Sequence, residues 1–118
     1  MGFALIRLFT GEDGQSHFET GELELPTPEG PAYCSPAWNA TQVSFKESPP
    51  GSSLDWHCAP VRQYVITLSG TLEFETRLGE RFTLAPGTIL QAEDTTGGGH
   101  KWHLVDDQPW RRVYVGLG

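Results

Sequence analysis

The sequence has few cysteines, no long hydrophobic run and no recognisable export signal. Its two cysteines, Cys34 and Cys58, are too few for a disulfide framework, and their spacing matches no zinc motif. No apolar stretch approaches the roughly 20 residues that a membrane-spanning helix needs. The N-terminal residues lack the apolar core and cleavage site of a signal peptide. We therefore expect a cytoplasmic protein with reduced thiols and no membrane partner.

Basic residues are also scarce. Eight Lys and Arg stand against fifteen Asp and Glu, which gives a net charge of −7. An acidic surface repels phosphate backbones, so nucleic acid is not an expected partner. With 118 residues, the chain is long enough for one domain that buries its own hydrophobic core. We expect a single domain over residues 1–118.

Glycine and proline are plentiful, and they separate short runs typical of β-strands. The runs recur about every ten residues, which favours an all-β sandwich or barrel, and no window shows the period of an amphipathic helix. The stretch Pro26–Pro36 is expected to be an irregular arm. The predicted strands are Phe3–Phe9, Gly21–Leu25, Thr41–Lys46, Gln63–Leu68, Thr71–Arg77, Arg81–Leu84, Thr88–Ala92, His100–Val105 and Trp110–Val115.

One stretch carries a spaced motif. Gly51 is followed after five residues by His57, and then come Ala59, Gln63 and Gly70. This spacing resembles the first motif of the cupin superfamily, G-x5-H-x-H-x3-E-x6-G. Ala59 stands at the position of the second His, and Gln63 stands at the position of the Glu. The chain thus keeps one of the three usual metal ligands of this motif.

A second stretch resembles the lead-in of the second cupin motif, G-x5-P-x-G-x2-H-x3-N. Leu84–Thr88 contains the Pro-Gly pair, and His100 comes later than the family's spacing has it. The chain also resembles small single-domain, RmlC-like cupins. The resemblance implies a double-stranded β-helix (jelly-roll) barrel that often forms a homodimer. N-terminal strands and the arm would occupy residues 1–40, and the motif-bearing barrel residues 41–118.

Strand periodicity selects the side chains that would face the barrel interior. Residues of equal parity share a face of a strand, and the cupin alignment turns His57 and Gln63 inward. In the last part of the chain, His100 shares its face with Trp102 and Leu104, whereas His103 lies opposite. We expect His57, Gln63 and His100 to meet inside the barrel.

These three side chains could serve as ligands of a metal ion. Two imidazoles and the amide of Gln63 could hold a divalent ion such as Zn, Mn, Fe or Ni, with positions left for substrate. Ala59 offers no ligand atom, so the charge would have to be balanced by Glu93 or Asp94. His17 is a further candidate imidazole. A metal-dependent oxygenase is the hypothesis that this depleted ligand set favours least.

The alternative needs no metal. His57 or His100 could shuttle a proton at neutral pH as general acid or base, with Gln63 or Tyr64 orienting a carbonyl or hydroxyl group of the substrate. Such a site suits an isomerase, lyase or cyclase acting on a small organic molecule. A non-catalytic small-ligand-binding cupin, such as a sensor or storage module, stays open beside it. The candidate substrate-binding residues are Trp56, Arg62, Tyr64, Glu93 and Trp102.

Two of these candidates also have structural readings. Arg62 could form an ion pair or a dimer contact in place of a substrate contact. Glu93 begins the sequence Glu-Asp-Thr-Thr, which glycines follow. That pattern is typical of a turn whose side-chain oxygens accept hydrogen bonds from the backbone. If it has a functional role instead, Glu93 is expected inside the barrel and paired with a His.

Overall fold

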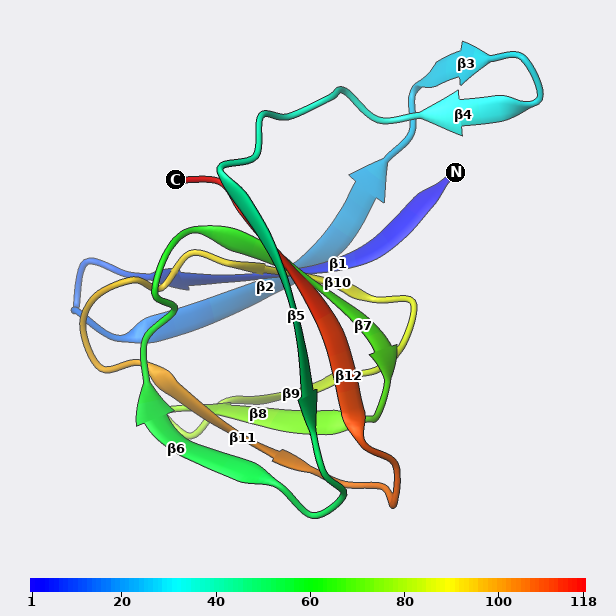
Figure 1. Ribbon diagram of the computed structural model, residues 1–118. Helices are drawn as coiled ribbons and strands as arrows, with labels where there is room; N and C mark the ends of the chain where they lie inside the picture. The colour runs from blue at the N-terminus through cyan, green and yellow to red at the C-terminus, as the bar shows by residue number, and fades with distance from the viewer.

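Twelve strands and no helix make up the protein, so the all-β prediction is confirmed. The computed structural model describes residues 1–118 (Figure 1). The strands are β1 (Gly2–Thr10), β2 (Ser16–Glu24), β3 (Thr27–Glu29), β4 (Ala32–Cys34), β5 (Gln42–Ser48), β6 (Ser53–His57), β7 (Gln63–Ser69), β8 (Leu72–Thr76), β9 (Arg81–Leu84), β10 (Ile89–Ala92), β11 (His100–Leu104) and β12 (Trp110–Gly116). The chain forms no helix with the length and hydrophobicity that crossing a bilayer requires.

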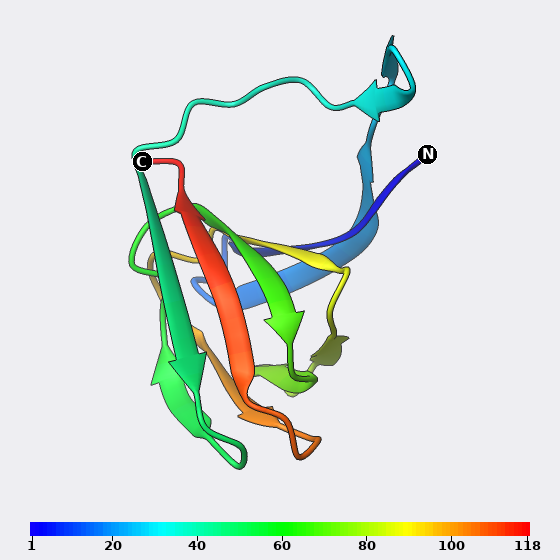
Figure 2. The same ribbon diagram turned by 45° about the vertical axis from the view of Figure 1, so that its right-hand side comes forward.

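Ten of the strands form two sheets that enclose the core. The larger sheet has the order β2-β1-β10-β7-β12-β5, and the smaller one has the order β6-β11-β8-β9. The pairing of β1 with β10 is parallel, and the other pairings are antiparallel. In Figure 2 the smaller sheet lies below and behind the larger one. The N-terminal strands therefore complete the larger sheet and do not form a separate unit.

Alternation along the strands decides what the sheets enclose. On β7, Val65 and Thr67 are buried while Leu68 is exposed, as the period of two requires. Aromatic rings fill the centre, where the Phe74 ring lies 4.9 Å from that of Phe82. Both sheets contribute to the buried hydrophobic residues, which are Ile6, Leu8, Ala59, Val65, Leu72, Phe74, Phe82, Leu84, Leu90, Ala92, Trp102, Leu104 and Trp110.

The arm after β2 is more ordered than its sequence predicts. Within Pro26–Pro36, β3 and β4 pair as a small hairpin that turns at Gly30 and Pro31. It projects away from the two sheets, and the chain then crosses to the start of β5 (Figures 1 and 2). The prolines suggested an irregular stretch, but the hairpin lies outside any large sheet, where Pro28 interrupts no long ladder.

Two further strand predictions need correction. β2 begins at Ser16, five residues before the predicted Gly21, because it follows β1 along all nine residues. Most of its residues are partly or fully exposed at the edge of the sheet, so no clear apolar alternation reveals it. β6 is absent from the predicted strands, and it has no buried residue.

Candidate functional site

A cavity of about 280 Å³ lies between the two sheets. Nine apolar or aromatic residues and eight polar or charged residues line it. The apolar group includes Val65, Phe74, Leu90, Trp102 and Trp110. The polar group includes His57, Gln63, His100, Arg112 and Tyr114. A largely apolar pocket with a few converging polar groups is the usual form of a small-molecule site, and this volume is near the lower end of that range.

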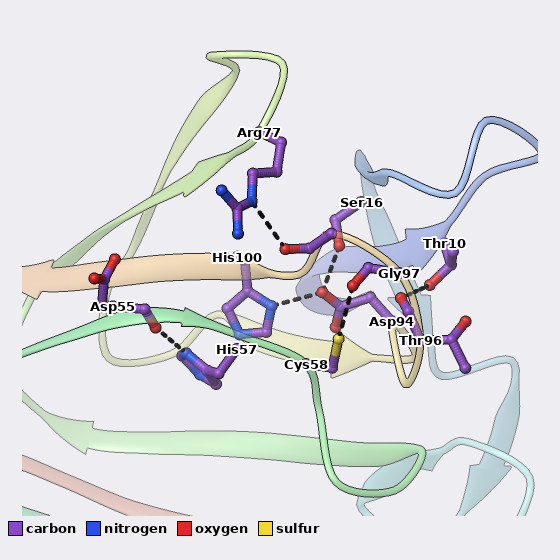
Figure 3. Close-up of polar contacts among 11 residues, drawn as sticks. Thr10, Ser16, Asp55, His57, Cys58, Arg77, Asp94, Thr96, Gly97 and His100 are labelled. Carbon is purple, nitrogen blue, oxygen red and sulfur yellow. Dashed lines mark hydrogen bonds and ion pairs between the residues drawn. The ribbon is translucent and has the colours of Figure 1, made fainter.

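His57 is fixed in one tautomer by the backbone. It is the last residue of β6, and its Nδ1 lies 2.7 Å from the carbonyl oxygen of Asp55 (Figure 3). A carbonyl oxygen only accepts hydrogen bonds, so Nδ1 carries the proton and donates it. Nε2 of the neutral ring therefore keeps its lone pair and has no partner within the chain. This is the form in which an imidazole accepts a proton.

The surroundings of His57 also favour its neutral form. Burial lowers the pKa of His57, and the hydrogen bond to the Asp55 carbonyl opposes this effect in part. The neighbouring ring of His100 lowers the pKa further, while Asp94 raises it. The net result is a pKa below the ordinary value of 6.5. His57 is consequently a base that is unprotonated at neutral pH.

His100 faces His57 across paired strands. The two residues are register partners on β11 and β6, and their ring centroids lie 4.4 Å apart in an edge-on arrangement. Nδ1 of His100 lies 2.6 Å from Oδ2 of Asp94 (Figure 3). A carboxylate oxygen accepts, so Nδ1 of His100 is a donor and its Nε2 is left for the cavity. The backbone ladder thus brings two anchored imidazoles together.

Asp94 is completely buried, and it holds His100 in place. Besides His100, the hydroxyl of Ser16 donates to the same Oδ2 at 2.6 Å. The other oxygen, Oδ1, has no hydrogen-bond partner. A buried carboxylate in contact with an imidazole stabilises the protonated ring when it forms, and it fixes the ring orientation. Ser16, Asp94 and His100 are therefore a positioning network behind the cavity.

The loop after β10 brings Asp94 inside by close packing against β6. The backbone N–H of Ala59 donates to the carbonyl of Asp94 at 3.1 Å. Gly99 has φ of 74° and lies so close to the carbonyl oxygen of His57 that a Cβ would overlap it. Only glycine combines this backbone conformation with this close approach. The Gly97–Gly99 run therefore serves the packing of the site.

Glu93, the neighbour of Asp94, points the other way. Its carboxylate accepts from Arg7 Nε at 2.6 Å and from Arg62 Nε at 3.0 Å. Burial raises the pKa of Glu93, but the hydrogen bonds and charges of the two arginines outweigh it and hold that pKa below its usual range. Glu93 therefore does not pair with a His. Asp94 does, because successive residues turn to opposite sides of an extended chain.

The predicted site residues divide into two groups. His57, Gln63, His100 and Trp102 line the cavity. The other four predicted residues do not line it, namely Trp56, Arg62, Tyr64 and Glu93. Trp56 packs under Arg77 and Lys101, and Tyr64 packs against Trp38. Arg62 and Glu93 form an ion pair with each other. All four are placed by their own neighbours outside the space between the sheets.

Two other histidines also lie elsewhere. His17 is held by Asp13, with Nε2 2.9 Å from Oδ2, and it does not line the cavity. His103 is exposed on the opposite side of β11 from His100. The proposed third imidazole is therefore not supplied by His17. Of the four histidines in the chain, the cavity holds two.

Sequence reasoning missed Ser16, Asp94's inward orientation, Arg112 and Tyr114. Arg112 and Tyr114 share a face of β12 with Trp110, so the period of two could have placed them beside Trp102. Ser16 gives no such signal, because it is 78 residues from Asp94 in the sequence. Its contact exists only through the pairing of β2 with β1.

The donor set does not fit a divalent metal. No group of three or more His, Cys, Asp and Glu side chains lies together as a metal site requires. In the cavity, the two imidazoles have only the neutral amide of Gln63 beside them, and Lys46 and Arg112 add positive charge. Cations nearby raise the cost of binding another cation. We therefore derive no chemical step through a metal.

Both cysteines are free. Cys34 lies on the projecting hairpin, and Cys58 lies next to His57, with its sulfur 3.5 Å from the carbonyl of Gly97. No disulfide joins them.

Comparison with known proteins assigns no family to the chain. No protein-family model matches it, and no curated protein matches it. The interpretation of the cavity accordingly rests on its geometry.

Proposed function

We propose that the protein is a cupin-fold enzyme that binds a small organic molecule in the cavity and moves a proton on it. The observation that carries this proposal is the pair of anchored imidazoles. Each of His57 and His100 uses Nδ1 in a hydrogen bond to the protein and leaves Nε2 for a ligand. The motif-like spacing around His57 supports the cupin assignment, together with a site between two β-sheets.

The two imidazoles are suited to different roles. His57 lacks a carboxylate partner and has a lowered pKa, so it is the base that removes a proton from the substrate. His100 is anchored to Asp94 through Nδ1, so its Nε2 is oriented toward the cavity, and we assign it the complementary role of donating a proton to the substrate. Gln63, whose amide makes no hydrogen bond within the chain, orients a carbonyl or hydroxyl group. Isomerisation, elimination and cyclisation all need such a pair.

Proton transfer can be tested without knowing the natural substrate. The protein would be incubated in D2O with a panel of small ketones and oxo acids, and loss of C–H signals would be followed by proton NMR. We expect the wild type to accelerate deuterium incorporation for at least one compound. His57→Asn should lower that rate about 100-fold or more, which is the usual contribution of general acid–base catalysis. His103→Asn is the matched control, because His103 is exposed and outside the cavity.

Asp94→Asn separates a positioning role from a purely structural one. The amide can present its N–H to His100, which would force the ring proton from Nδ1 to Nε2. Nitrogen-15 NMR of the imidazoles should show this change of tautomer in a folded protein, together with slower exchange. An unchanged tautomer and an unchanged rate would contradict the assigned role.

The non-catalytic alternative predicts a different result. A binding protein would show shifts of the Trp102 indole signal when compounds enter the cavity, with no deuterium incorporation in any compound that binds. That outcome would replace the enzyme proposal with a small-ligand-binding cupin.

The proposal includes pairing of two copies into a homodimer. Its support is the outer face of β5, β12 and β7, which is apolar. Val43, Phe45 and Leu68 are exposed there by 56%, 75% and 58%. Val113 and Val115 lie between them on β12 and are partly exposed. Such a patch on an otherwise acidic protein is typical of an interface with another protein. The protein is further proposed to act in the cytoplasm.

A further inference from the structure

We infer that the cavity binds an organic carboxylate and that Arg112 holds its negatively charged group. The inference rests on the proposed function, since it names the class of molecule that the same cavity takes. It begins from the inner face of β12, where Trp110, Arg112 and Tyr114 follow one another and all line the cavity.

Arg112 is a buried cation without a carboxylate partner. It is only 6% exposed. Its Nη1 donates to Ser48 Oγ at 2.8 Å and to the carbonyl of Trp110 at 3.0 Å, and its Nε donates to Tyr114 Oη at 3.0 Å. All three acceptors are neutral. The guanidinium carbon also lies 3.8 Å from the centroid of the Trp110 ring, a cation–π contact that offsets part of the cost of burial. None of these contacts supplies a negative charge, so an anion in the cavity would add the compensation that the fold lacks.

Each of the other arginines either contacts a carboxylate or is exposed to water. Four of them contact a carboxylate, namely Arg7, Arg62, Arg81 and Arg111. Arg77 has no carboxylate partner, but it is exposed to water. Arg112 is the only buried arginine, and it has no carboxylate partner in a chain with fifteen acidic residues. The missing countercharge is therefore specific to the cavity.

The cavity as a whole has the opposite sign to the protein. Its lining includes Lys46 and Arg112 and no Asp or Glu. The net charge of the protein is −7. A positive, partly enclosed site concentrates anions, because the low-dielectric walls screen its charges less than water does.

Hydrogen-bond donors remain free at this end of the cavity. The bonds of Arg112 use Nε and Nη1, so the two hydrogens of Nη2 have no acceptor in the chain. Tyr114 accepts from Arg112 through Oη, which leaves its own O–H to donate. A carboxylate can accept from Nη2 and from the Tyr114 hydroxyl together. The remaining walls, with Val65, Leu90 and Trp102, suit an apolar body behind that group.

The test compares acids with neutral molecules of the same shape. Isothermal titration calorimetry with the wild type would compare benzoate with benzamide and 2-methylbutanoate with its amide. We expect each acid to bind about ten- to a hundredfold more tightly than its amide, as a hydrogen-bonded charge pair provides. Phenyl phosphate tests the other common anion, and we expect it to bind more weakly than benzoate.

Adjacent arginines give a matched pair of variants. Arg112→Gln should abolish the preference for acids, whereas Arg111→Gln should keep it, because Arg111 is exposed and lies near Glu47. Circular dichroism would establish that each variant folds. If Arg112→Gln does not fold, Tyr114→Phe decides, since it removes one proposed donor and keeps the ring. A lowered preference supports the inference, and an unchanged one overturns it.

Three results would overturn the inference: equal binding of acids and amides, a folded Arg112→Gln that keeps the preference, or tighter binding of phenyl phosphate than of benzoate. Its failure is distinguishable from failure of the proposed function. Selective binding of acids without deuterium incorporation would leave the carboxylate site and remove the enzyme. Deuterium incorporation into neutral ketones with no preference for acids would do the reverse.

Discussion

The two faces of the six-stranded sheet depart from the ordinary pattern in opposite ways at a few positions. The inner face contains buried polar side chains, among them Gln63, Thr67 and Arg112. The outer face has exposed apolar side chains, with Phe45 and Leu68 the most exposed on β5 and β7. Buried polar groups without full partners cost stability, and exposed apolar groups gain none. Both departures motivate the two proposed partners, a ligand inside and a second chain outside.

Two adjacent residues of the loop after β10 also differ between the inside and the outside of the fold. Asp94 is fully buried with Ser16 and His100, while Glu93 is clamped outside by two arginines. Both are carboxylates with short hydrogen bonds. Their surroundings alone distinguish a group that orients the His100 imidazole from a group that fastens the loop to β1 and to the segment before β7.

The largest effect on stability is expected from Gly99→Ala, which disturbs the packing around the buried residues of the site. An added Cβ meets the carbonyl oxygen of His57, and the positive φ adds strain. We expect the free energy of unfolding to fall by about 3 kcal/mol. Gly79→Ala is the control, because Gly79 has φ of 84° in open space. It should cost about 1 kcal/mol. Equal losses in urea denaturation would show that the close approach to His57 is unimportant.

A smaller effect, on the proposed pairing of two copies, is expected from Phe45→Glu on the outer face of the sheet. If two copies pair through this face, an added charge at its most exposed ring should raise the dissociation constant of the dimer about tenfold or more. Leu78→Glu is the control, since Leu78 is 53% exposed in the turn between β8 and β9. Analytical ultracentrifugation over a range of concentrations measures both. A wild type that stays monomeric throughout would refute the dimer.

The smallest effect is expected at Glu93, and it depends on pH. Because the pKa of Glu93 is lowered in the fold, the unfolded chain binds its proton more readily. The resulting stability is present above the unfolded pKa near 4.5 and is lost as pH falls through the folded pKa. At pH 7, Glu93→Gln should cost about 1 kcal/mol, because Arg7 and Arg62 are partly exposed and screened by water.

This pH dependence provides its own check. Urea denaturation should show the difference between wild type and Glu93→Gln shrinking as pH falls below 4.5. Glu12→Gln, an exposed acid with no ion pair, is the matched control and should show no such trend. A difference that stays constant across this range would mean that the ion pairs of Glu93 do not stabilise the fold.

Much of the candidate site was predictable from the sequence, and the residues that the prediction missed were missed for physical reasons. The period of two correctly turned Gln63 away from Tyr64 and His100 away from His103. It did not reach Ser16 or β6, because strands with no apolar alternation leave no local signal. Trp56 was predicted to bind substrate, but it is the neighbour of His57 on β6, and neighbours in a strand face opposite sides.

The inward orientation of His57 was expected only from the cupin-like motif, since β6 shows no apolar alternation. The amino-acid sequence by itself determined the all-β class, the strands with a buried face and the inward orientation of His100. These follow from local periodicity, which a strand expresses wherever it is placed. Only the tertiary structure decided that Asp94 would bind His100 and that Arg112 would stand without a carboxylate. Those facts depend on strand order and on pairings between distant segments. Which side chains become neighbours across a sheet is settled when the sheets assemble.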